Sequence, residues 1–142
     1  MVVKARLNYA RLAKALAKEG KNEKAIEVLN YCMDALPLDK IPYDPYMPDI
    51  IEAFFAAGDS DKAVEMTNAL CNHYYEQLDY YLKQTPYIIS SAEYEIQSAL
   101  QYTSRVADTC IKYQKQDLGL GINAKLQAYY TKYLAMQQPA KK

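Results

Sequence analysis

Two stretches of the chain repeat one pattern at a shift of 38 residues. Residues 13–29 read AKALAKEGKNEKAIEVL, and residues 51–67 read IEAFFAAGDSDKAVEMT. In both, a glycine (Gly20 or Gly58) is followed by a short polar run and then by Lys-Ala. Glycine readily adopts the left-handed backbone that ends a helix, and short polar side chains cap the next one. The pattern therefore predicts two helix–turn–helix hairpins.

Details of the pattern predict how each hairpin is built. Asn22 in the first stretch, and Ser60 or Asp61 in the second, are expected to cap the second helix. Ala25 and Ala63 are small where the two helices of a hairpin must approach closely. Since one hairpin cannot hide its whole apolar stripe, such hairpins stack on one another.

This pattern resembles the tetratricopeptide repeat, a helical hairpin of about 34 residues. In the first stretch nearly every signature position holds an acceptable residue, namely Tyr9, Leu12, Ala13, Leu16, Gly20, Ala25, Leu29, Cys32 and Pro37. The second stretch matches at Ile50, Ile51, Phe54, Gly58, Ala63 and Leu70. Thr67 and Tyr75 depart from the pattern. The resemblance implies a right-handed superhelix whose groove binds a peptide or a protein.

The linker between the two hairpins is expected to hold the extra length. A shift of 38 residues implies about four more than the repeat needs, and we place them within residues 37–48. Pro45 suits the first turn of a helix capped by Asp44, so the second hairpin is expected to begin there.

Beyond residue 70 the repeat pattern fades, but helical patterns continue. Residues 61–83 are typical of one long helix, and Ser90 and Glu93 have the spacing of a capping box. Apolar and small residues then recur at helical spacing, at Ile96, Ala99, Leu100, Thr103, Val106, Ala107, Cys110 and Ile111. Gly119 and Gly121 are expected to break this helix. A last helix carries Ile122, Leu126, Tyr129, Tyr130 and Tyr133 on one face.

The expected fold is all-α, with about six helices in three antiparallel hairpins. One domain covers residues 1–136, with hairpins at about 6–39, 44–83 and 90–136, and residues 137–142 form a flexible tail. The third hairpin is long and atypical, as expected of a cap on the last repeat.

Charge and hydropathy exclude several kinds of partner. The net charge is +3 over residues 1–40, −8 over 41–100 and +5 over 101–142. Nucleic acid requires one continuous basic surface, so it is not an expected partner. The acidic middle indicates either solvated helix faces or an acidic binding patch near residues 44–65. No run of eighteen apolar residues occurs, so we expect a soluble chain that does not insert into a membrane.

Little in the sequence indicates catalysis. His73 is the single histidine, and we expect a structural or solvent-facing role for it. Cys32, Cys71 and Cys110 are too widely spaced for a zinc or paired-thiol motif and are expected to be buried free thiols. We therefore expect no enzyme, no metal and no cofactor.

Tyrosine is in excess, at 15 of 142 residues. Adjacent pairs such as Tyr74-Tyr75 cannot both face inward, because neighbouring helical residues point about 100° apart. Such rings either fill gaps between helices with their hydroxyls at the surface, or form a partner-binding face.

The repeat register places one set of side chains along the groove, made of Leu7, Ala10, Lys14, Ala17, Pro48, Glu52 and Phe55. Together with the aromatic and acidic linker, this register predicts the partner-binding residues Lys14, Tyr43, Tyr46, Asp49, Glu52 and Phe55. The family's clamp for a terminal carboxylate is not expected, because Ala10, Pro48 and Asp49 stand where it needs polar or basic side chains. We expect a non-catalytic interaction module, a scaffold suited to a basic or amphipathic peptide.

The opening of the chain has a second resemblance. Residues 6–13 (RLNYARLA), 20–25 (GKNEKA) and 41–44 (IPYD) are similar to the soluble C-terminal tail of large bacterial multi-span membrane proteins of mannosyltransferase-like type. The resemblance implies a piece of a longer protein, tethered through its parent to a bacterial inner membrane. The helical pattern that begins almost at once fits this expectation. The alternative function is then a structural or oligomerisation tail.

Overall fold

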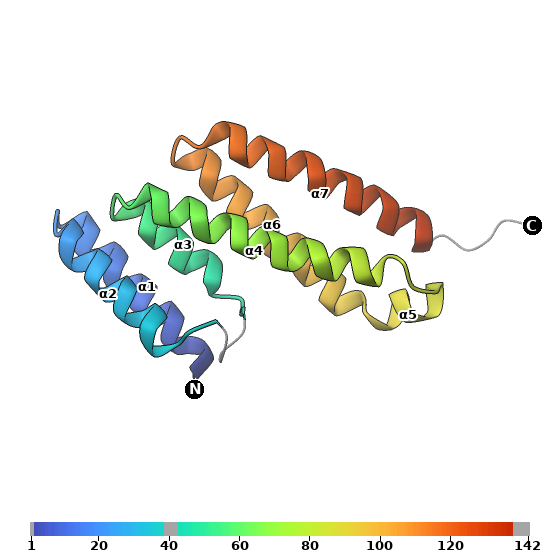
Figure 1. Ribbon diagram of the computed structural model, residues 1–142, viewed down its shortest axis with the longest axis horizontal. Coiled ribbons are helices and arrows are strands. Elements are labelled where there is room, and N and C mark those ends of the chain that lie inside the picture. The colour runs from blue at the N-terminus through green and yellow to red at the C-terminus, as the bar shows by residue number, and fades with distance from the viewer. Residues whose placement is uncertain (1, 39–42, 138–142) are drawn as a thin grey trace, which may run out of the picture. The chain divides into compact units, whose positions relative to one another are not determined.

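The computed structural model describes residues 2–38 and 43–137. The described residues form seven α-helices and no strand, which confirms the predicted all-α class. The helices are α1 (Val2–Lys18), α2 (Asn22–Ala35), α3 (Met47–Ala56), α4 (Ser60–Tyr81), α5 (Pro86–Ser91), α6 (Glu93–Lys112) and α7 (Gln116–Gln137) (Figure 1). Six helices were expected, and the additional one is the short α5. Gln137, the first residue of the predicted tail, ends α7. Residues 138–142 of that tail and linker residues 39–42 lie outside the described residues.

The chain divides into two compact units, Met1–Asn68 and Ala69–Lys142, with the boundary inside α4. In the first unit α1 packs against both α2 and α3, and α2 also contacts α3. In the second unit α6 and α7 pack along each other, and α5 contacts both. The three repeat boundaries and the superhelix stay predictions.

The two glycine turns have the same geometry. Gly20 and Gly58 have φ values of +82° and +90°, which confirms the predicted left-handed backbone. One residue later, the amide of Lys21 donates to the carbonyl of Leu16 at 2.9 Å, and that of Asp59 to Phe54 at 3.0 Å. Both turns are Schellman motifs, which satisfy the last carbonyls of the helix that ends there.

The caps that follow these turns differ from the predicted ones. The cap of α4 is Asp59, whose Oδ1 accepts from the amide of Lys62 at 3.2 Å, and neither Ser60 nor Asp61 fills this role. Asn22 lies inside α2 and gives no cap, because the helix follows Lys21 directly. In both hairpins the motif leaves one residue between the glycine and the next helix.

The start of α3 was also placed too early. The helix begins at Met47 with Pro48 in its first turn, so Asp44 and Pro45 precede it. Asp44 Oδ1 accepts from the amide of Tyr46 at 2.9 Å and so shapes the turn that leads into the helix. The other carboxylate oxygen, Oδ2, lies 3.1 Å from Arg6 Nη1 and makes a long-range contact that local sequence cannot show.

The predicted capping box at Ser90 and Glu93 was wrong. Ser90 lies inside α5, which Thr85 caps by accepting from the amide of Ile88 at 3.4 Å. Pro86 begins this short helix because its missing amide and fixed φ suit a first helical position.

The predicted break at Gly119 and Gly121 was wrong as well, because both residues lie inside α7. The turn between α6 and α7 is made instead at Gln114, whose φ of +70° is left-handed. Lys115 then donates to the carbonyl of Cys110 at 2.7 Å, so this turn repeats the Schellman bond of the other two. The sequence did not indicate this turn, because Gln114 stands where glycine is usual.

Gly119 has a packing role instead. It is buried, and a Cβ there would lie 2.6 Å from Ile111 Cγ1 and 2.7 Å from the backbone oxygen of Ala107. The missing side chain therefore sets how closely α6 and α7 approach. A Cβ at Gly121, two residues later, would have no atom within 4 Å.

The core follows the predicted helical stripes. Ala25 and Ala63 are fully buried, as their places in the hairpins predicted. The predicted stripe of α6 is buried at Ile96, Ala99, Thr103, Val106, Ala107 and Cys110. On α7, Ile122, Leu126 and Tyr133 are buried, whereas Tyr130 is exposed.

We predict opposite effects for two alanine substitutions in α7. Gly119→Ala should destabilise the protein by about 1–3 kcal/mol, because backbone and a branched side chain occupy the space of the new methyl group. Gly121→Ala should stabilise it by about 0.5–1 kcal/mol through the higher helix propensity of alanine. Urea unfolding followed by circular dichroism measures both. Equal effects of the two changes would contradict the close approach at Gly119.

Candidate functional site

Two of the predicted binding residues meet on the first unit. Lys14 Nζ on α1 lies 3.4 Å from Glu52 Oε1 on α3, with the two side chains 41% and 13% exposed. Their helices pack against each other, so the pair joins the first helices of the two glycine-turn hairpins. The register predicted that these two residues share a groove, and the structure brings them into contact.

The remaining predicted residues lie at different depths. Tyr43, Tyr46 and Asp49 are half-buried. Burial raises the pKa of Tyr43, although the nearby positive charge of Arg6 lowers it. Phe55 is only 4% exposed and belongs to the core of α3, so its side chain offers a partner almost no surface.

The residue that sequence reasoning missed in this unit is Arg6. Its guanidinium is completely buried, pairs with Asp44 at 3.1 Å and donates to the carbonyl of Leu36 at 2.9 Å. Leu36 directly follows α2, so one side chain on α1 connects the end of α2 to the turn before α3. A signal was present, because Arg6 shares a helical face with the buried Ala10 and Ala13.

The second unit contains an aromatic cluster around Tyr75. Its ring stacks on that of Tyr129 at 5.6 Å between centroids, and Lys125 Nζ lies 4.4 Å from its centre. The Tyr129 hydroxyl donates to Asp79 at 2.8 Å. Rings thus fill the space between helices while a hydroxyl reaches an exposed carboxylate, which is the packing role expected for tyrosine.

The cysteines are buried free thiols, as predicted. Burial raises the pKa of the Cys71 thiol to about 12, although a hydrogen bond with Tyr75 lowers it. Burial likewise raises the pKa of Cys32 to about 11, against the lowering effect of Arg6. Thiols held protonated are poor nucleophiles and poor metal ligands.

His73 is partly buried and contacts two neighbours on its own helix, α4. Its Nε2 lies 3.3 Å from Gln77 Nε2, and its ring meets Tyr74 edge-on at 4.9 Å. Burial lowers its pKa, while Glu76 raises it. Within the described ranges, no group of three His, Cys, Asp or Glu side chains could hold a metal ion.

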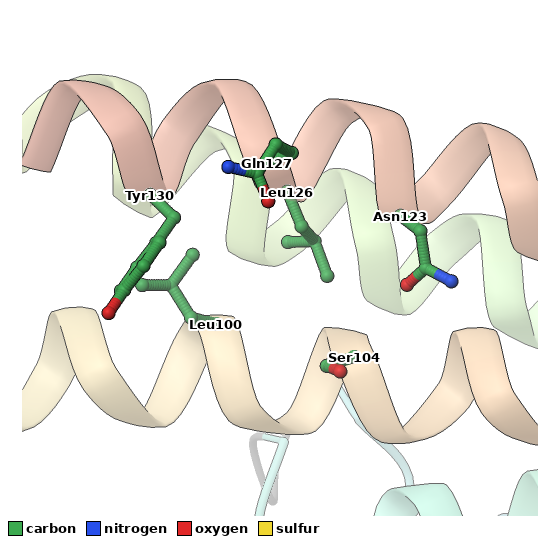
Figure 2. A pocket seen from close by; sticks show the side chains of 6 residues that line it. All are labelled: Leu100, Ser104, Asn123, Leu126, Gln127 and Tyr130. Carbon is green, nitrogen blue, oxygen red and sulfur yellow. The ribbon is translucent and has the colours of Figure 1, made fainter.

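A hollow of about 310 Å³ lies between α6 and α7 in the second unit. Figure 2 shows Asn123, Leu126, Gln127 and Tyr130 entering it from α7, opposite Leu100 and Ser104 of α6. Its polar residues Ser104, Asn123 and Gln127 belong to none of the sequence patterns described above.

The chain matches no protein family, no curated protein and no solved structure. The likeness to tetratricopeptide repeats therefore rests on the residues and turns described above. None of the helices in the described part of the chain is both long enough and apolar enough to cross a membrane.

We predict that the buried ion pair is essential to the first unit. Asp44→Asn keeps an oxygen for the amide of Tyr46 but removes the negative charge that Asp44 places beside the buried guanidinium. It should destabilise the protein by about 3–5 kcal/mol. Denaturant unfolding measures the loss, with Asp34→Asn on the exposed side of α2 as the control. A loss below about 1 kcal/mol, the range of exposed pairs, would contradict the argument.

We also predict that the folded protein resists alkylation at pH 8. A thiol pKa near 12 instead of 9.0 reduces the thiolate fraction of Cys71 roughly a thousandfold. Iodoacetamide followed by mass spectrometry should label the cysteines rapidly in denaturant and very slowly in buffer. Rapid labelling of Cys71 without denaturant would show that this site opens readily.

Proposed function

We propose that the chain is a non-catalytic interaction module whose first unit binds a peptide or protein along α1 and α3. The observation that carries the proposal is the pair Lys14–Glu52, which presents opposite charges at 3.4 Å from the first helices of two successive hairpins. Tetratricopeptide domains use this side of their helices to hold peptides. The matching turns at Gly20 and Gly58 support the same architecture.

The energetics of this pair suit exchange with a partner. A partly exposed ion pair contributes only about 0–1 kcal/mol to folding, so a partner can replace it at little cost. The carboxylate of Glu52 would bind a basic group of the partner. Asp49, three residues earlier on α3, adds negative charge. This favours a basic or amphipathic segment as the ligand.

The aromatic residues of the linker complete the proposed surface. Tyr43 and Tyr46 flank the turn held by Asp44 and stay partly accessible. Tyrosine is enriched at binding hot spots, because it buries a large area with few rotatable bonds. Phe55 would act indirectly, by supporting α3 from the core.

A charge swap separates binding from folding. Lys14→Glu with Glu52→Lys restores the internal ion pair in reverse, so stability should stay within about 0.5 kcal/mol of the original. Binding should fall at least tenfold, because the partner meets each charge reversed. Affinity capture from a detergent lysate of the source cell, with the original and swapped domains as baits, identifies partners that follow this pattern.

The controls decide between the alternatives. Tyr46→Ala should weaken capture of the same partner, whereas Glu27→Lys on the exposed side of α2 should leave capture unchanged. If all baits hold a partner equally, its binding surface lies elsewhere on the protein. Recovery of the parent protein alone would favour the structural or oligomerisation tail.

A further inference from the structure

The hollow between α6 and α7 has an unusual lining. Leu100 and Leu126 provide apolar surface, and Ser104, Asn123 and Gln127 provide neutral hydrogen-bonding groups beside the Tyr130 ring (Figure 2). None of the described residues that line it is a Lys, Arg, Asp or Glu. A charged group placed there would lose hydration without gaining a counter-charge, so the hollow favours a neutral ligand with both donors and acceptors.

The surroundings on α7 extend this neutral surface. Leu120 precedes Asn123 by three residues and Leu134 follows Tyr130 by four, so both continue the same face of the helix. They are 53% and 41% exposed. The nearest lysine on the helix, Lys125, is directed elsewhere, because its Nζ lies over the ring of Tyr75. Two exposed leucines therefore flank the hollow along α7, and we refer to the hollow with Leu120 and Leu134 as the groove.

Asn123 and Gln127 are spaced along α7 at nearly the repeat of an extended peptide. They lie four residues apart, which is about 6 Å along the helix axis. Residues on one side of an extended peptide repeat every two residues, at about 6.6–6.8 Å. Each carboxamide has two N–H donors and one oxygen acceptor, so it can bind the N–H and the C=O of one peptide residue.

The carboxamide of Gln127 and the leucines of the lining can contact a bound peptide. Gln127 Nε2 donates to Thr131 Oγ1 at 3.3 Å, a long and exposed bond that a ligand can replace. Leu100 and Leu126 can receive an apolar side chain of the residue between the two bound ones. A volume of about 310 Å³ stands at the lower limit of ligand pockets, about 300–1,000 Å³. It suits a short stretch of peptide and not a large cofactor.

We propose that this groove binds an extended, uncharged peptide segment through its backbone, with Asn123 and Gln127 as the recognising carboxamides. The site is separate from the surface around Lys14 and Glu52, and its existence does not depend on that function. Its specificity comes from backbone geometry and from one apolar side chain, so many uncharged sequences would bind weakly.

The test uses two synthetic libraries and the whole chain. One contains acetylated, amidated pentapeptides of Gly, Ala, Ser, Thr, Val and Leu, and the other carries N-methyl groups on alternate backbone nitrogens. In two-dimensional NMR spectra, the side-chain amide signals of Asn123 and Gln127 should shift with the first library at millimolar concentration. Binding of the second should be at least tenfold weaker, because N-methylation removes the donors.

Variants test the same contact from the protein side. Asn123→Leu with Gln127→Leu removes both carboxamides at partly or fully exposed positions and should weaken binding at least tenfold. Gln101→Leu, an exposed amide of α6 outside the lining, is the matched control and should bind normally. The N-methylated library tests the contact in the unaltered protein, so the result does not depend on how the variants fold.

Three outcomes would overturn the proposal. One is the absence of shifts at these amides with the first library. Another is equal binding of both libraries, which would mean that apolar contact alone drives association. The third is concentration-dependent broadening of these signals without peptide, because a second copy of the chain would then occupy the groove.

Discussion

The buried guanidinium of Arg6 is the constraint around which the first unit is organised. It has no exposed surface, so its charge must be satisfied inside the protein, and Asp44 and the carbonyl of Leu36 do so. Asp44 in turn accepts from the amide of Tyr46, which orients the chain just before α3. Because α1 carries the guanidinium, the end of α2 and the start of α3 are both held against α1. The contact between Lys14 and Glu52 requires the same arrangement, since it also joins α1 to α3.

In the second unit the corresponding constraint is steric. Gly119 lets the backbone of α7 approach Ala107 and Ile111 of α6 to distances that a methyl group would forbid. One face of α7 is committed to this contact and to Tyr75, and Asn123, Gln127 and Tyr130 of the same helix line the hollow. The groove beside Asn123 and Gln127 follows from that division. Tyrosines take part in both the packing and the groove. The Tyr129 hydroxyl donates to Asp79, whereas Tyr130 lines the groove.

The two proposed sites differ in the physical basis of recognition. The surface at Lys14 and Glu52 offers charges, and its binding should therefore weaken as salt screens them. The groove of the second unit offers carboxamides and leucines, and salt should affect it little.

The sequence by itself determined the helical class, the two glycine turns, the buried stripes and the burial of the cysteines, because these depend on backbone preference and on local periodicity. Lys14 and Glu52, which the resemblance to a repeat predicted to line one groove, lie in contact. Tertiary structure alone decided the rest. Gln114 rather than Gly119 makes the last turn, because close packing with α6 places that glycine inside a helix. Asp44 stands before α3 and not at its cap, and its carboxylate contacts both the amide of Tyr46 and a guanidinium 38 residues away. The groove between α6 and α7 could not be predicted from the sequence, because its lining residues become neighbours only when the two helices pack.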